Sequence, residues 1–133
     1  MTLGINATVR NARLNAIRDA IDAGAAGGYL RVYDGARPAT GGAATTLLAE
    51  LTFSDPCAPN AAGGVLTFSA ITADASANST GTATWCRIVD STGGFVADGS
   101  VGTSGADYNL NTTSISAGVQ VSCTSASITE GNP

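Results

Sequence analysis

The sequence predicts a mainly β protein, an antiparallel, jelly-roll-like β-sandwich with one N-terminal α-helix. Apolar residues recur at helical spacing only near the start of the chain, over 8–23. From residue 29 onward they alternate with polar residues in short runs separated by turns rich in Gly, Asn and Asp. Such runs are typical of antiparallel sandwiches, among which the jelly roll is the leading form. A chain of 133 residues fits one domain, 1–133.

The helix is predicted over TVRNARLNAIRDAIDA, residues 8–23, with Thr8 capping its start and Gly24 ending it in a left-handed conformation. Arg18 and Asp22 are spaced to pair along it. Its arginine-bearing flank has two possible roles, as a solvated face or as a partner-docking face. The residues expected to form its buried stripe are Val9, Ala12, Leu14, Ala16, Ile17, Ala20 and Ile21.

The remainder, 29–128, is predicted to form the sandwich, between an N-terminal arm (1–7), the helix and a C-terminal tail (129–133). The predicted strands are YLRVYDG (29–35), TTLLAELTF (45–53), GVLTFSAI (64–71), TATWCRIVD (82–90), GFVADGSV (94–101), a short piece at 108–110, and VQVSCTSASI (119–128).

The tetrapeptide Leu-Thr-Phe-Ser occurs twice, at 51–54 and 66–69. In each copy Leu and Phe fall on one face of a strand, and Thr and Ser on the other. The flanking residues differ, so we interpret the copies as two half-buried strands and not as a repeat. The loop between them, 54–64, is long for a hairpin, and Pro56 and Pro59 make it a candidate contact loop.

The chain lacks lysine and histidine and has a net charge of −4. A serine or cysteine nucleophile needs a base of those types, so we expect neither an enzyme nor a cofactor. We expect no nucleic-acid partner, because phosphate binding needs a broad basic face. We also expect no membrane partner, because no apolar run approaches the roughly 18 residues of a spanning helix.

The three cysteines, Cys57, Cys86 and Cys123, are far apart and are expected to stay reduced, with Cys86 and Cys123 buried in strands. They offer no clustered set of metal ligands. The aspartates at 34, 55, 74, 90, 98 and 107 lie beside Gly, Pro or Ser, where accepting main-chain hydrogen bonds in turns is their usual role.

The aromatic residues leave two alternatives open. Trp85, with Tyr29 and Tyr33, either anchors a core or interface or forms a sugar-binding platform. The first alternative is the more common use of such residues.

Six segments carry a family resemblance over nearly the whole chain: VRNARLNAIRDAIDAG, LRVYDGARPAT, LLAELTFSDP, GGVLTFSAI, GTATWCRIVD and TEGNP. In these the chain resembles small virion structural proteins of tailed bacteriophages and prophages. The resemblance implies a capsid cement or decoration protein with a jelly-roll body. It brings no catalytic residues with it.

The function expected from the sequence is therefore decoration of a phage capsid, by binding and stabilising the lattice of the major capsid protein. The chain is expected to be made in the host cytoplasm and to act on the capsid surface as a dimer or trimer. The alternative is a carbohydrate-binding module of a tail or fibre. The N-terminal arm either adds a strand to another subunit or folds back on its own sandwich. The candidate interface residues are Leu3, Ile5, Arg10, Arg13, Pro56 and Pro59.

Overall fold

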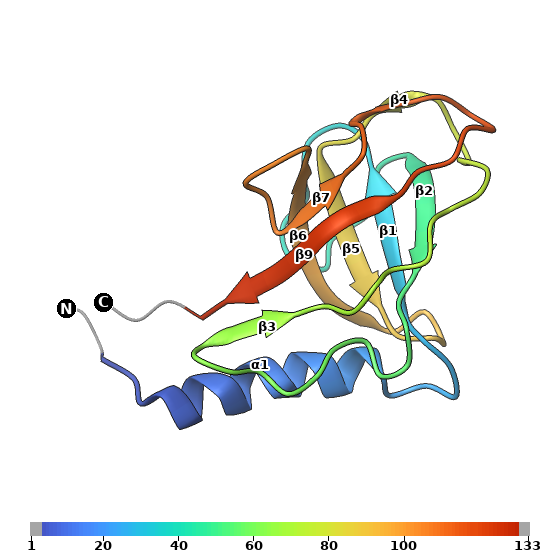
Figure 1. The fold of residues 1–133 in the computed structure, drawn as a ribbon. Helices are drawn as coiled ribbons and strands as arrows, with labels where there is room; N and C mark the ends of the chain where they lie inside the picture. The colour runs from blue at the N-terminus through green and yellow to red at the C-terminus, as the bar shows by residue number, and fades with distance from the viewer. Residues whose placement is uncertain (1–3, 131–133) are drawn as a thin grey trace.

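The computed structural model describes residues 4–130 and is mainly β with one helix, as predicted (Figure 1). The helix packs across one end of a curled sheet. The elements are α1 (Ala7–Ile21), β1 (Tyr29–Tyr33), β2 (Leu47–Thr52), β3 (Val65–Thr67), β4 (Gly81–Thr82), β5 (Trp85–Val89), β6 (Phe95–Gly102), β7 (Tyr108–Leu110), β8 (Ser114–Ile115) and β9 (Cys123–Thr129).

The large sheet has seven strands in the order β2-β1-β5-β6-β7-β9-β3, and β4 pairs with β8 in a small second sheet. The sheet is mixed: its other strand pairs are antiparallel, as predicted, but β6 and β7 run parallel. Residues 103–107 leave the sheet and return, so β7 continues in the direction of β6. Asp107 Oδ2 closes this excursion by accepting hydrogen bonds from the Ser100 N–H and hydroxyl, both 3.1 Å long.

The two Leu-Thr-Phe-Ser copies lie in β2 and β3 and their following residues, at opposite ends of the strand order. The curl nevertheless brings them together, because the Phe53 and Phe68 rings lie 5.3 Å apart. Leu and Phe of both copies are buried, while Thr and Ser are half-buried or exposed, which confirms the predicted faces. Thr52 also forms an isolated antiparallel bridge to Thr72, so the curled sheet nearly closes on itself.

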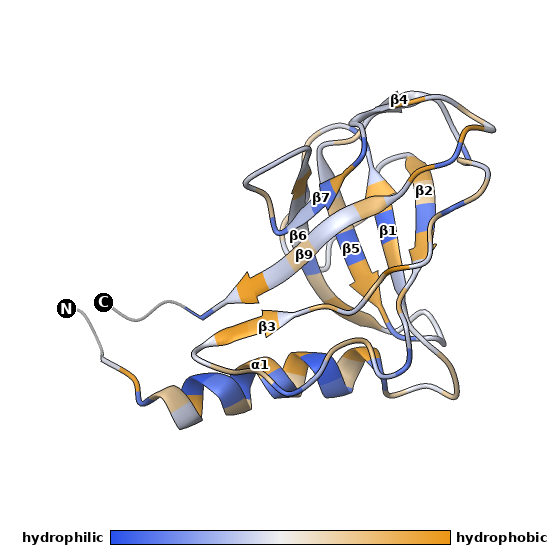
Figure 2. Ribbon diagram, viewed as in Figure 1, coloured by the Kyte–Doolittle hydropathy of each residue, from blue (hydrophilic) through white to orange (hydrophobic). Residues whose placement is uncertain are grey.

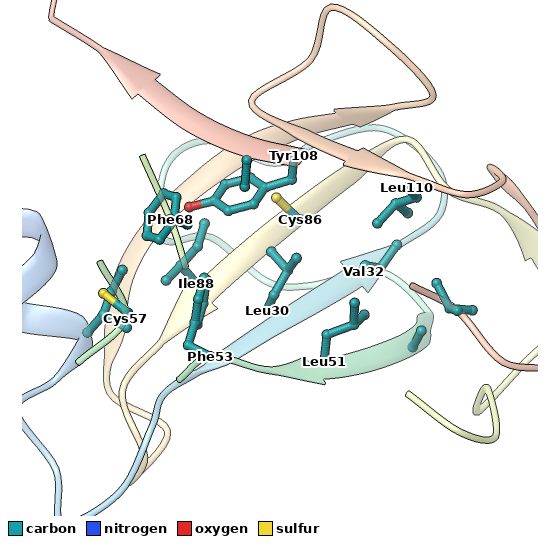
Figure 3. Close-up of a cluster of buried hydrophobic side chains, with 14 of the residues drawn as sticks. Leu30, Val32, Leu51, Phe53, Cys57, Phe68, Cys86, Ile88, Tyr108 and Leu110 are labelled. Atoms are coloured by element: carbon teal, nitrogen blue, oxygen red, sulfur yellow. The ribbon is translucent and has the colours of Figure 1, made fainter. Parts of the chain in front are cut away.

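The core fills the inside of this curl (Figure 3). Leu30, Val32 and Ile88 contribute from the central strands, where hydrophobic and hydrophilic residues alternate (Figure 2). Leu14 and Ile21 of α1 close one end and are fully buried. Because the sheet curls around one set of side chains, a chain with few large apolar residues still builds a continuous core.

The helix differs from its prediction at both ends. Asn6 caps it, in place of Thr8, because the Asn6 side chain accepts a 2.8 Å bond from the Thr8 N–H. The helix ends at Asp22, and Gly24 is not among the glycines with positive φ. Gly24 instead lets Ser91 pack against the main chain that follows the helix, because a Cβ at position 24 would clash with the Ser91 hydroxyl.

The buried stripe of α1 is also narrower than predicted. Leu14 and Ile21 are buried and Ile17 is half-buried, while Val9, Ala12 and Ala16 are exposed. The large side chains at spacings of three and four bury more apolar area than alanines do, so they determine which side faces the core. The exposed residues therefore form an uncharged strip on the outer side of the helix.

The Tyr108 side chain lies in the core beside Phe53 and Phe68, and its buried hydroxyl makes no hydrogen bond with residues 4–130. We predict that Tyr108→Phe leaves stability unchanged or raises it by about 1 kcal/mol, because it removes an unsatisfied polar group without opening a cavity. Urea unfolding of the two proteins measures this. A loss above about 1 kcal/mol would show that the hydroxyl is hydrogen-bonded in solution.

Candidate docking surface

The two N-terminal arginines bind their own chain. Arg10 Nε donates to the Ile5 carbonyl at 3.2 Å, and Arg10 Nη1 donates to the Glu130 carbonyl at 3.4 Å. Arg13 Nη1 lies 2.9 Å from Glu130 Oε1. Of the predicted interface residues, Ile5, Arg10 and Arg13 thus meet at the end of β9, while Leu3 lies outside the described residues. Their first role is to tie the last strand to the helix.

The loop 54–64 lies along the helix. Three side chains, two in α1 and one at its C-cap, accept hydrogen bonds from main-chain N–H groups of this loop. Asn11 accepts from the Gly64 N–H at 2.8 Å, and Asn15 accepts from the Ala61 N–H at 2.8 Å. Asp22, the C-cap residue, accepts from the Cys57 N–H at 3.0 Å. The acceptors are spaced by four and seven residues, so they occupy one side of the helix. Asp22 therefore does not pair with Arg18, which binds Asp19 and Asn60.

Pro56 and Pro59 stay exposed on the outside of this loop, as a contact loop requires. The exposed strip of α1 has Val9 at its N-terminal end, with 51% of the residue exposed. The sequence analysis predicted that the residues of this strip, Val9, Ala12 and Ala16, would be buried, whereas the structure exposes them. The sequence did contain a signal for this exposure, because the larger residues Leu14, Ile17 and Ile21 mark the opposite side of the helix as the buried one.

Trp85 is buried on the outer side of the sheet. Its ring stacks on Tyr33 at 4.6 Å, and its Nε1 donates to the Asp34 carbonyl and the Thr45 hydroxyl, both at 3.1 Å. Trp85 is 1% exposed and Tyr33 is 6% exposed. Trp85 is therefore a buried anchor that packs on Tyr33 outside the main core cluster, and its ring does not form an exposed sugar platform.

Arg87 lies beside this pair, between two aromatic rings. Its guanidinium is 5.3 Å from the Trp85 ring centre and 5.2 Å from that of Phe95. It makes two hydrogen bonds to Asp98, of 2.7 and 3.1 Å, and Asp98 also accepts from the Gly41 N–H. Burial raises the pKa of Asp98, but the bonds from Arg87 and Gly41 outweigh it and hold this pKa below its ordinary value. The cluster fixes the loop between β1 and β2 over the sheet.

The predicted turn role is confirmed for Asp74 and Asp90, which accept from N–H groups two to four residues ahead, whereas Asp34 and Asp107 accept from main-chain groups 12 and 7 residues away. Asp34 accepts from the Thr46 N–H, Asp74 from Ser76, Asp90 from Thr92 and Gly94, and Asp107 from Ser100. Asp98 differs from these, because it lies within β6 and pairs with Arg87. Within residues 4–130 no group of three or more His, Cys, Asp or Glu side chains gathers as metal ligands.

The three cysteines carry free thiols; Cys57 and Cys86 are buried, whereas Cys123 is half-buried, which corrects the prediction for Cys123. Burial, followed by the nearby Asp22 carboxylate, raises the pKa of Cys57 to about 12. Burial also raises the pKa of Cys86, with a smaller contribution from Asp107.

These thiols predict a loss of stability in alkali. Between the ordinary thiol pKa of 9.0 and about 12, the unfolded chain releases the Cys57 proton while the folded chain keeps it. The stabilisation that comes from keeping these thiols protonated is therefore fully present below pH 9. It decreases as pH rises, and the free energy of unfolding falls by up to about 1.4 kcal/mol per pH unit for each thiol. Urea unfolding between pH 8 and 11 should show a steeper decline for the natural chain than for Cys57→Ala. Equal slopes would contradict the assignment.

In the described part of the chain, no helix is long and apolar enough to cross a membrane. Comparisons of the chain with protein-family models, with curated proteins and with solved structures find no match.

Proposed function

We propose that the chain is a virion structural protein of a tailed bacteriophage, a decoration protein that binds the lattice of the major capsid protein. The observation that supports this most is the uncharged outer strip of α1, formed by Val9, Ala12 and Ala16. Protein interfaces have cores that are depleted in charged residues, as this strip is. The exposed Pro56 and Pro59 lie on the loop that packs along the same helix.

The arginines around this strip already have partners within the chain. This favours docking through buried apolar surface over docking through ion pairs with the partner. Arg10 and Arg13 are engaged with Glu130, and Arg18 is engaged with Asp19 and Asn60. The resemblance to phage virion proteins supports a capsid as the partner. On this proposal the protein works on the capsid surface as a small homo-oligomer, after synthesis in the host cytoplasm.

The copy number in purified virions tests this function. Quantitative mass spectrometry should find the chain in numbers comparable to the major capsid protein, as expected for a lattice-binding protein. A number that is a small fraction of the capsid protein would assign the chain to the tail and overturn the proposal. Absence from the virion would overturn it as well.

Because few charges are available for binding, we predict that decorated particles keep the protein in about 1 M salt, where the Debye length is about 3 Å. Sedimentation of particles at low and high salt, followed by quantification of the bound chain, measures this. Quantitative release at high salt from intact capsids would show that exposed ion pairs hold the protein, which contradicts docking by burial.

A further inference from the structure

The large sheet has a slit between residues 95–99 of β6 and residues 127–129 of β9. The strand between them, β7, is three residues long and pairs with β6 only at Val101 and Gly102. Before that point β6 pairs with β5 on one side and with no described strand on the other. Over 127–129, β9 likewise pairs only with β3. The slit therefore opens where β7 begins.

A pocket of about 180 Å³ lies in this slit. Its apolar walls come from four elements: Ile17 of α1, Ile88 of β5, Tyr108 of β7 and Ile128 of β9. Figure 3 shows the side chains of Ile88 and Tyr108 inside the curl of the sheet. An apolar cavity of about 150 Å³ is large enough to take up benzene. The pocket can therefore hold the aliphatic part of a side chain.

Asp107 brings a carboxylate to this pocket. Its Oδ2 atom accepts two hydrogen bonds, from the N–H and the hydroxyl of Ser100, both 3.1 Å long. Its Oδ1 atom accepts none, and no arginine forms an ion pair with this carboxylate, within residues 4–130. Burial raises the pKa of the neighbouring Cys86, and the negative charge of Asp107 raises it further. A charge without a counterion in the described chain thus lies at an apolar pocket.

The main chain of β6 offers a second acceptor. The Ser100 N–H points to Asp107, away from β5. Main-chain groups of a strand alternate in direction, so those of Asp98, two residues earlier, point to the same side. On that side β6 has no strand neighbour at Asp98, and Asp98 also lines the pocket. The Asp98 carbonyl therefore faces the slit together with the Asp107 carboxylate.

These features select an ammonium group on an aliphatic stem. The stem suits the apolar walls, and the cation suits the carboxylate and the carbonyl. Both acceptor sites of Asp107 Oδ2 are already used by Ser100. A guanidinium favours two parallel bonds to both oxygens of a carboxylate, which this arrangement does not offer. An ammonium is a compact charge that bonds to single acceptors, so lysine fits the pocket better than arginine.

We propose that this pocket accepts a lysine side chain of a partner protein, with its ammonium at Asp107 Oδ1 and its stem between the isoleucines. The chain has no lysine, so a second copy cannot supply this side chain. The inference rests on the proposed function only for the identity of the partner, which is then the major capsid protein. An ion pair enclosed in a pocket is screened by salt much less than an exposed pair, so this contact agrees with retention at high salt.

A titration of the isolated protein tests the pocket without capsids. With Nα-acetyl-lysine amide as the probe, the NMR amide signals of Gly99 and Ser100 should shift with a Kd of about 1–10 mM. The norleucine analogue, which lacks the ammonium, and the arginine analogue should each bind at least about fivefold more weakly. Equal binding of the lysine and norleucine compounds, or no binding of the lysine compound, would overturn the proposal.

Two variants change the pocket in different ways. Asp107→Asn removes the charge and should weaken binding of the lysine compound at least about tenfold. Gly99→Ala adds a methyl group beside Asp107 and Tyr108 and should weaken it at least about fivefold. The fold tolerates this methyl group, because its contacts, of 3.4 to 3.6 Å, are ordinary van der Waals distances. Thermal unfolding checks both variants.

The matched control is Asp55→Asn, which removes the same charge from an exposed aspartate without a hydrogen bond or ion pair in the described chain. It should bind the probe as the natural chain does. Unchanged binding in Asp107→Asn, or an equal loss in Asp55→Asn, would contradict a site at Asp107.

Carbodiimide coupling of decorated particles identifies the source of the side chain, because the reagent joins a carboxylate to a neighbouring amine as an amide. Peptide mapping should find Asp107 joined to a lysine of the capsid protein, and a lysine in such a link cannot come from this chain. Links to lysine elsewhere but none at Asp107, or a link from Asp107 to a second copy, would overturn the proposal. If the chain does not bind capsids at all, the proposed function fails, while the titration still decides whether the pocket binds lysine.

Discussion

Replacing Asp98 by alanine is expected to destabilise the protein by about 3 kcal/mol, whereas replacing Glu50 by alanine costs less than about 1 kcal/mol. The two carboxylates lie in one row across β2, β1, β5 and β6, since Glu50 pairs with Arg31 and Asp98 with Arg87. The Asp98 side chain is fully buried, but 35% of the Glu50 side chain is exposed. Removing Asp98 leaves the guanidinium of Arg87 without its partner, between two rings.

Urea unfolding of the two variants measures this difference, and Glu50→Ala serves as the control for loss of an exposed ion pair. The double variant Arg87→Met with Asp98→Leu should lose less than Asp98→Ala, because no charge is left unpaired. The lowered pKa of Asp98 means that its contribution is present above the ordinary value of 3.8 and is lost as pH falls below it. Equal losses for Asp98→Ala and Glu50→Ala would contradict this account.

The strands were predictable because half-buried strands alternate apolar and polar residues, and the cores of β1, β2, β5, β6 and β9 fall inside the predicted runs. The short β7 was predicted at its observed bounds. The pair β4 and β8 was missed as a sheet, because two-residue strands are too short to show a period. The parallel pairing of β6 with β7 depends on how 103–107 folds back, for which the sequence has no periodic signal.

The residues of the candidate surface were predictable by type but not by partner. The arginines near the N-terminus appeared available for docking, because the sequence does not show that Glu130 returns to the helix. Such contacts join residues 120 positions apart, and only the fold brings them together. The spacing of Asn11, Asn15 and Asp22 did contain a signal, since three short polar acceptors on one side of a helix suit a docked loop.

Val9→Asp is expected to weaken binding to capsids by at least about 100-fold while leaving the thermal stability of the isolated protein nearly unchanged. Val9 is 51% exposed at the N-terminal end of the uncharged strip of α1, so the folded monomer tolerates a carboxylate there. In a docked complex the same carboxylate would be buried without a partner, which costs several kcal/mol. Co-sedimentation with capsids that lack the protein measures the affinity, and thermal unfolding checks the fold.

The chain provides a closely matched control. Val119 is also an exposed valine, at 56%, and it lies in the turn before β9, away from α1. Val119→Asp therefore adds the same charge at similar exposure and should bind capsids as the natural chain does. If Val119→Asp loses binding and Val9→Asp retains it, the outer strip of α1 is not the docking surface. If only Val9→Asp loses binding while both variants stay folded, docking through the helix is the explanation, because net charge and stability are matched between them.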